Sequence, residues 1–211
     1  MLFLPVTRIW SIEPVVAAFD ASDIPKEVYL LLDAPGCEGW ADAFHERGWL
    51  THTVATRNPD PPAGRLERRS RHRVMRTLSQ EMTKNLGRVL YSEDDTLVPH
   101  DVWHRLSALL DAGYTAASGV QRGRHECNAC GVWHWDREAN IMDVFHPHGI
   151  EEADAVGHYC LMTTGAAYAA APLSEHPNEP VDTGHTRRLA PIAVDSSIWC
   201  GHLKENGEII A

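Results

Sequence analysis

One short segment constrains the fold of this chain more than any other: Val89-Leu90-Tyr91-Ser92-Glu93-Asp94-Asp95-Thr96-Leu97-Val98-Pro99. Its apolar first half predicts a buried strand, and a proline follows three consecutive carboxylates. Adjacent carboxylates repel one another and are costly to bury without a cation. At the end of a core strand they therefore predict a bound Mg2+ or Mn2+ ion, because these hard ions prefer oxygen donors. The alternative interpretation is a solvated acidic turn.

The length and composition favour one ordinary globular domain. The chain has 211 residues, 44% of them hydrophobic and 23% charged, which is enough for a single α/β domain over residues 1–211. No apolar run approaches the roughly 20 residues that a membrane span needs, and the first residues lack the features of a signal peptide. We therefore expect a cytoplasmic protein, in the host cytoplasm if it is phage-encoded, with no membrane partner. Five cysteines, an odd number, do not suggest a secreted disulfide framework.

The charge is acidic overall but basic in one place. A net charge of −10 argues against a surface built for nucleic acid, which needs clustered Lys and Arg. A local basic site suits a small anion such as a nucleotide diphosphate better than a long polyanion. The basic residues that cluster are Arg65, Arg68, Arg69, Arg71, Arg73 and Arg76.

The first half of the chain alternates predicted strands and helices. Strands are expected at 2–7, 28–33 and 50–55, with helices at 14–19 and 40–47 between them. This order predicts an α/β fold of the Rossmann type, a three-layer sandwich with a mostly parallel central sheet. In such sheets ligands bind at the carboxyl ends of the strands, where the three acids lie.

A long helix is predicted from about residue 65 to 85, after a Pro-rich loop. On a helical wheel, Arg65, Arg69, His72 and Arg76 share one face. The opposite, core-facing side is expected to carry Val74, Met75, Leu78 and Met82. The basic face is either a solvated arginine surface or one that reaches a phosphate with one or two of its side chains.

The second half is expected to contain a helix at 101–112, a strand at 114–120 and a hairpin around 132–135. A strand followed by a helix is expected within 159–171. A short helix at 183–189 and a last strand at 192–195 complete the prediction.

The chain resembles the nucleotide-sugar-dependent glycosyltransferases of the GT-A fold, in particular the family-two-like members. The acid cluster looks like the Asp-any-Asp motif of that fold, with Glu93 first and Asp95 last. The segment Pro5-Val6-Thr7-Arg8 is similar to its first nucleotide-contacting loop, and Arg57-Asn58 to another. The run from Asp182 to Leu203 is similar to the family segment in which an acid opens a helix and a Gly-His pair closes the motif.

The resemblance implies a set of site residues. Asp95 and His202 would bind Mn2+ or Mg2+ on the donor diphosphate, with Glu93 assisting, and an imidazole ligand favours Mn2+. Asp182 would accept the proton of the acceptor hydroxyl in an inverting displacement. The remaining contacts to the donor would come from Thr7, Arg8, Arg57, Arg65, Arg69, Arg76, Glu93 and Asp94.

The implied activity is transfer of a sugar from a nucleoside-diphosphate sugar, a UDP-sugar above all, to an acceptor hydroxyl. Residues 1–99 would form the nucleotide-binding half and residues 100–211 the acceptor-binding half, with 121–158 contacting the acceptor. Some small GT-A proteins of phage glycosylate hydroxymethylated bases in DNA, so such a base is a candidate acceptor.

Two other functions stay open. A metal-dependent nucleotidyltransferase would keep the acid cluster, would not need His202, and would release pyrophosphate. A non-enzymatic nucleic-acid-binding module would instead be built on a structural zinc at Cys127 and Cys130, beside the arginine-rich helix. The Cys-x2-Cys pair lacks a matching second pair, so a redox disulfide or two ordinary loop cysteines are alternatives.

Overall fold

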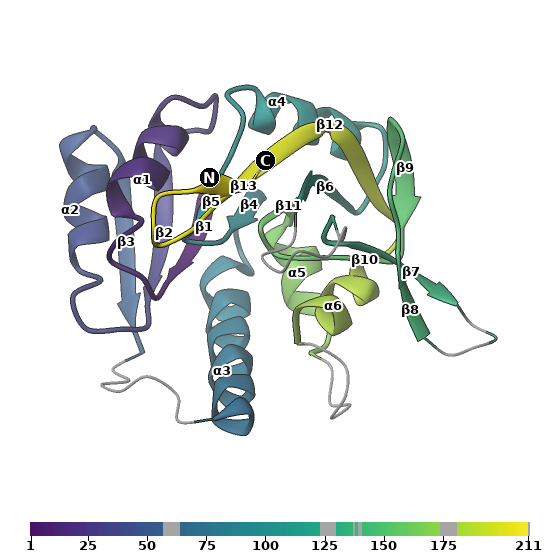
Figure 1. Ribbon diagram of the computed structural model, residues 1–211, viewed down its shortest axis with the longest axis horizontal. Helices are drawn as coiled ribbons and strands as arrows, with labels where there is room; N and C mark the ends of the chain where they lie inside the picture. Colours follow the sequence, from purple (N-terminus) through teal and green to yellow (C-terminus); the bar gives the residue numbers. More distant parts are fainter. Residues whose placement is uncertain (57–63, 123–129, 137, 139–140, 174–180, 211) are drawn as a thin grey trace.

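The computed structural model describes residues 1–56, 64–122, 130–136, 138, 141–173 and 181–210, and only the backbone at 65, 66, 68 and 141 (Figure 1). Arg57 and Cys127 lie outside these ranges, as does the side chain of Arg65. None of the helices in the described ranges combines the length and apolar character that crossing a membrane requires.

A mixed sheet forms the centre of the molecule. Its strands run, in spatial order, β13 (Ile209–Ile210), β12 (Ile192–Leu203), β6 (Ala116–Gln121), β11 (Cys160–Thr164), β4 (Arg88–Ser92), β1 (Leu2–Val6), β2 (Glu27–Leu32) and β3 (Leu50–Ala55). The β4–β1–β2–β3 half is parallel, and β6 is parallel to β12. Between these two parts, β11 is antiparallel to both of its neighbours.

Shorter strands extend this sheet. β5 (Thr96–Leu97) and β9 (Ile150–Ala153) both pair antiparallel with β12. A separate three-stranded sheet has the order β10 (Ala155–Val156), β7 (Val132–Asp136) and β8 (Ile141–Val144). The β7–β8 pair is antiparallel, which confirms the predicted hairpin.

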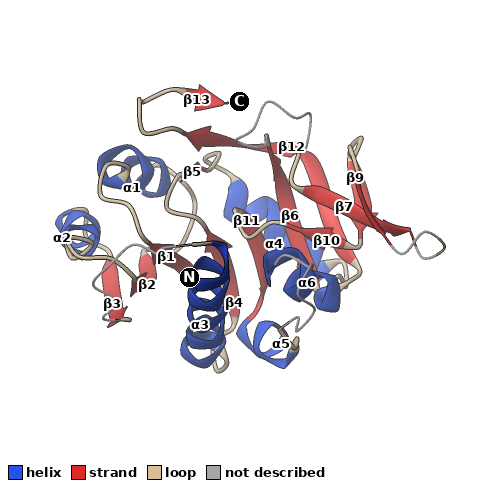
Figure 2. Ribbon diagram, turned by 60° about the horizontal axis from the view of Figure 1, so that its bottom comes forward, coloured by secondary structure: helices blue, strands red, loops and turns tan. Residues whose placement is uncertain are grey.

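Helices cover both faces of the central sheet (Figures 1 and 2). One face packs against α1 (Ile12–Asp20), α2 (Gly39–Glu46) and α4 (Val102–Asp111). The other face packs against α3 (Arg65–Thr83), α5 (Gly165–Ala170) and α6 (Val181–Thr186). A short 3-10 turn, Arg187–Leu189, follows α6. Each face of the sheet has its own hydrophobic core, and alternate strand residues belong to different cores because successive strand side chains point to opposite faces. On β4, Leu90 joins the first core while Val89 and Tyr91 join the second.

The three-layer α/β sandwich with a mostly parallel sheet is therefore confirmed. The last strand is longer than predicted, running to Leu203, because its second half pairs with β5 and β13. One expected core position is wrong: Val74 is 47% exposed. The buried side of α3 carries Met75 together with polar side chains, namely Arg76, Ser79 and Thr83.

Candidate active site

The loops that follow β1 and β4 meet at one end of the sheet. Because β1 and β4 are parallel neighbours, their carboxyl ends lie together. The Asp94 carboxylate accepts hydrogen bonds from the backbone N–H groups of Thr7 (2.6 Å) and Arg8 (2.9 Å), and from the Thr7 hydroxyl (3.1 Å). The Arg8 guanidinium pairs with the same carboxylate and lies 3.5 Å from Asp95 Oδ2. Asp94 thus fixes the first loop against the acid cluster.

Asp95 is brought to His202 by strand pairing. His202 is opposite Thr96 in the antiparallel β5–β12 pair, and the Leu203 N–H donates to the Asp95 carbonyl at 2.9 Å. His202 Nε2 then lies 3.2 Å from Asp95 Oδ2, with both side chains buried. Two ligands at about 2.1 Å from one ion and at right angles to each other would be about 3.0 Å apart. The 3.2 Å separation is that of a hydrogen bond or ion pair, and it is also compatible with two ligands of one divalent ion.

The pair offers two protein ligands. Within the described ranges, no three His, Cys, Asp or Glu side chains gather closely enough to hold a metal ion. An ion at Asp95 and His202 would consequently complete its coordination with oxygens from substrate and water, as Mg2+ sites commonly do.

A pocket of about 430 Å³ opens beside these loops. This volume falls in the range of small-molecule sites, roughly 300–1,000 Å³. Its wall combines carboxylates with two guanidinium groups and one imidazole, a combination suited to a charged, polar ligand. The lining residues are Pro5, Thr7, Arg8, His72, Met75, Arg76, Glu93, Asp94 and Asp182.

Asp182, at the start of α6, is paired with Arg76 of α3. Arg76 Nε donates to Asp182 Oδ1 at 2.9 Å, and the Arg76 side chain is only 9% exposed, against 27% for Asp182. Burial alone would raise the pKa of Asp182, but the Arg76 charge outweighs it and holds that pKa well below its usual range. Asp182 is therefore ionised at neutral pH.

Two buried histidines lie behind Asp182. His158 Nδ1 is 3.5 Å from Asp182 Oδ1, and His158 Nε2 is 3.3 Å from His185 Nδ1. Burial lowers the pKa of His158 well below its ordinary value and that of His185 to about 4. Both rings are therefore uncharged at neutral pH.

A second polar cluster lies at the carboxyl ends of β2 and β3. Arg71 Nη2 donates to the Asp33 carbonyl at 3.0 Å, and Arg71 Nε lies 3.3 Å from Asp33 Oδ2. The Thr56 hydroxyl donates to Asp33 Oδ1. These contacts tie α3 to the sheet.

The pocket unites most of the expected site residues. Thr7, Arg8, Arg76, Glu93, Asp94 and Asp182 line it, while Asp95 and His202 meet each other close by. Arg69 is partly exposed and does not line it. Cys130 is buried and its thiol donates to the Phe145 carbonyl at 2.8 Å; its predicted zinc partner, Cys127, is outside the described ranges.

Three residues of this site were not predicted from the sequence: His72, His158 and His185. His72 carried a signal, since it precedes Arg76 by one helical turn on the predicted basic face. His158 and His185 carried none: each is a single histidine with no motif around it, and only the packing of α6 against β10 and α5 reveals their contact.

The sequence matches no known family model, and no curated protein sequence matches it. Solved structures share the fold. A197 from STIV aligns with a TM-score of 0.56 at 10% identity, covering 99% of this chain and 91% of that one. A glucose-1-phosphate thymidylyltransferase from Bacillus anthracis aligns with a TM-score of 0.53 at 12% identity, and the alignment covers 95% of this chain and 88% of that one. A UDP-glucose pyrophosphorylase from Acinetobacter baumanii aligns with a TM-score of 0.52 at 11% identity, and the alignment covers 94% of this chain and 86% of that one. At these identities the likeness shows the fold alone.

Proposed function

We propose that this protein is a metal-dependent glycosyltransferase that moves a sugar from a nucleoside-diphosphate sugar, in the first instance a UDP-sugar, to an acceptor hydroxyl. One observation carries the proposal: an ionised carboxylate, Asp182, lies in the pocket beside which Asp95 and His202 meet. Glycosyl transfer needs both a base and a means of neutralising the leaving diphosphate.

The donor would bind across the ends of β1 and β4. A divalent ion on Asp95 and His202, with Glu93 assisting, would offset the charge that develops on the leaving diphosphate. Arg8 and Arg76 line the same pocket and supply guanidinium donors that match phosphate oxygens. The backbone after β1, at Thr7 and Arg8, is held in place by Asp94.

Asp182 would act as the general base. In the free protein its ion pair with Arg76 makes it a weak base. A phosphate oxygen in the pocket competes for the Arg76 donors, so donor binding raises the basicity of Asp182. The carboxylate then takes the proton of an acceptor hydroxyl as that oxygen attacks the sugar, which gives an inverting displacement.

The acceptor side belongs to the second half of the chain, residues 100–211, and the nucleotide side to residues 1–99. A hydroxymethylated base in phage DNA is one candidate acceptor. The net charge of −10 favours an acceptor that presents a small contact area over one that lies along the protein as a long duplex.

A metal-dependent nucleotidyltransferase is the second candidate. It is favoured by the solved structures of shared fold, which include a thymidylyltransferase and a pyrophosphorylase of sugar metabolism. Such a reaction would use the acids and arginines of the pocket but not the Asp182 base. The zinc-based nucleic-acid module is the third. Burial raises the pKa of the Cys130 thiol, which makes the thiolate that zinc binds harder to form there.

Phosphorus NMR of the products tests the proposal. Incubation with UDP-, GDP- and dTDP-sugars, Mn2+ and a panel of hydroxyl acceptors is expected to release a nucleoside diphosphate from one donor. The Asp182→Asn variant should lower the rate by about 10²–10⁴-fold, while donor affinity is kept or strengthened because the Asp182 charge no longer competes for Arg76. Formation of pyrophosphate from a nucleoside triphosphate and a sugar phosphate would select the nucleotidyltransferase instead.

A further inference from the structure

A chain of ring nitrogens runs from Asp182 into the protein and ends on a backbone carbonyl. After the Asp182–His158 and His158–His185 contacts, His185 Nε2 lies 3.2 Å from the Tyr168 carbonyl oxygen. Both imidazoles are fully buried. Because each nitrogen faces a protein neighbour, the donors and acceptors around the two rings limit which nitrogens carry protons.

The carbonyl at the end of the chain sets the first proton. We assign the hydrogen to His185 Nε2, because the Tyr168 carbonyl oxygen, 3.2 Å away, can only accept. Gln80 Nε2 lies 3.3 Å from the same ring nitrogen, but it donates to the carbonyls of Tyr168 (3.1 Å) and Ala171 (2.7 Å). Its two hydrogens are used there, so it gives none to His185.

The other protons follow in turn. A neutral His185 with a hydrogen on Nε2 has a lone pair on Nδ1, which accepts from His158 Nε2–H. His158 is then left with a lone pair on Nδ1, directed at Asp182. Among the residues that the structure describes, that nitrogen has no hydrogen-bond partner, as expected for a lone pair beside an ionised carboxylate.

The charges around His158 keep it neutral. Burial is the largest influence, and the neighbouring Arg76 cation, with His185 and His72, also lowers the pKa of His158, whereas Asp182 raises it. Tyr168 packs edge-on against the ring, with centroids 5.8 Å apart. A neutral ring cannot act on Asp182 as a cation, so the Nδ1 lone pair is what it offers.

The geometry points to His158 as a positioning residue that accepts a hydrogen bond from Asp182 once Asp182 has taken the acceptor's proton. This inference rests on the proposed function. The acceptor O–H bond breaks and its proton forms an O–H bond on the Asp182 carboxyl, while the acceptor oxygen bonds to the sugar and the diphosphate leaves with the electron pair of the old bond. The new carboxylic O–H donates to His158 Nδ1, and no proton passes to the ring.

Arg76 and His158 therefore act on Asp182 in opposite directions. Arg76 stabilises the ionised form that begins the reaction, and His158 stabilises the protonated form that results from it. The 3.5 Å separation in the free protein is expected to shorten in the reacting complex, as catalytic hydrogen bonds often do.

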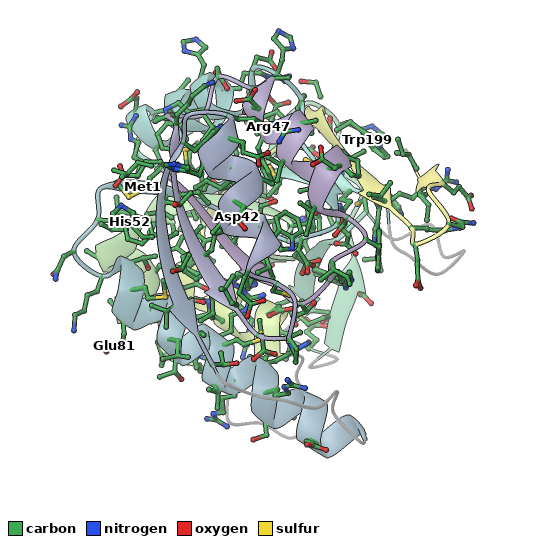
Figure 3. All side chains as sticks on the ribbon, turned by 90° about the vertical axis from the view of Figure 1, so that its left-hand side faces the viewer. Met1, Asp42, Arg47, His52, Glu81 and Trp199 are labelled. Atoms are coloured by element: carbon green, nitrogen blue, oxygen red, sulfur yellow. The ribbon has the colours of Figure 1, made fainter. Side chains whose placement is uncertain are left out.

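Kinetics of three variants test this assignment. His158→Phe removes the lone pair but keeps a ring, so kcat should fall about tenfold with the donor KM unchanged. The acid limb of the pH profile of kcat should also move to lower pH, because protonated Asp182 loses its stabilising partner. His158→Asn keeps an oxygen acceptor near the Nδ1 position and should recover part of kcat. The control His52→Phe, on the outermost strand β3 (labelled in Figure 3), should match wild type.

Nitrogen NMR of the free protein tests the protonation of the two histidines without any substrate. At pH 7, long-range 15N–1H spectra should show both His158 and His185 protonated on Nε2. Asp182→Asn places an amide donor at Asp182 and should shift the His158 Nδ1 resonance alone.

The outcomes separate the two ideas. A His158 protonated on Nδ1, or charged, overturns the inference, as does wild-type kcat in an active His158→Phe enzyme. If no nucleotide sugar is turned over, the proposed function fails, and the NMR arm alone still decides whether His158 faces Asp182 with a lone pair.

Discussion

His202 Nε2 lies 3.2 Å from Asp95 Oδ2, although 107 positions separate the two residues in the chain. The contact follows from the pairing of β5 with β12, which sets His202 opposite Thr96. Since both side chains are buried beside a pocket that carries two arginines, this pair is where a metal-assisted reaction on a diphosphate would be centred.

His202→Gln is expected to change metal preference. An imidazole favours Mn2+ over Mg2+, whereas an amide oxygen suits both ions. The Mn2+-over-Mg2+ preference in donor affinity should fall by about tenfold, measured as the donor dissociation constant with each ion. His52→Gln, on the outer strand, is the control; equal preference in wild type and His202→Gln would remove His202 from the ion.

Arg76→Met should destabilise the fold, because it leaves Asp182 without its main partner in a largely buried site. Breaking a fully buried pair costs about 3–5 kcal/mol, and the 27% exposure of Asp182 lowers the expected loss to about 2–4 kcal/mol. Urea unfolding at pH 7 measures it. Arg88→Met, at an exposed ion pair with Asp111, should have a much smaller effect.

Stability should fall as the pH is lowered through the window set by His185. The folded protein holds the pKa of this ring at about 4, below the ordinary value of 6.5, so the unfolded chain takes up a proton first. Between these values the free energy of unfolding should fall by about 1.4 kcal/mol per pH unit for this group.

His185→Gln should reduce this slope by the share of His185 and leave that of His158, whose pKa burial also lowers, whereas Gln at the exposed His104 should leave the slope unchanged. The comparison requires urea unfolding at several pH values from 7.5 down to 4.5. A His185→Gln protein with the wild-type slope would show that His185 is not the group that titrates.

Gly165→Ala should disturb the packing that places Arg76. A Cβ at Gly165 would lie 1.7 Å from the Thr83 carbonyl oxygen, at the end of the helix that carries Arg76. We expect a loss of about 3 kcal/mol or more, measured by urea unfolding. Gly87→Ala is the matched control, because no atom of the described residues lies within 4 Å of a Cβ there.

Local patterns were enough to predict the fold and the principal acids. The apolar run before Glu93 and the alternation of strands and helices gave the sheet, and residue spacing placed His72 and Arg76 on one helical face. The resemblance to GT-A proteins supplied the long-range partners, Asp182 and His202, which no local pattern links to the acid cluster.

Tertiary packing decided what the sequence did not predict. Helical periodicity put Val74 in the core and Arg76 outside it, yet Val74 is exposed and Arg76 is buried because it is paired with Asp182. An ion pair between residues 106 positions apart has no local signature. The same holds for His158, whose role depends on neighbours from α3, α5 and α6.

Thermal unfolding with nucleotide sugars tests the central claim most directly. With Mn2+ present, one of the UDP-, GDP- or dTDP-sugars at about 100 times its dissociation constant should stabilise the protein by about 2.7 kcal/mol, a rise in Tm of about 5–10 °C. The rise should disappear in Asp95→Ala and persist in Asp111→Asn, a change at the surface. Absence of stabilisation by every one of these donors with Mn2+ would contradict the account.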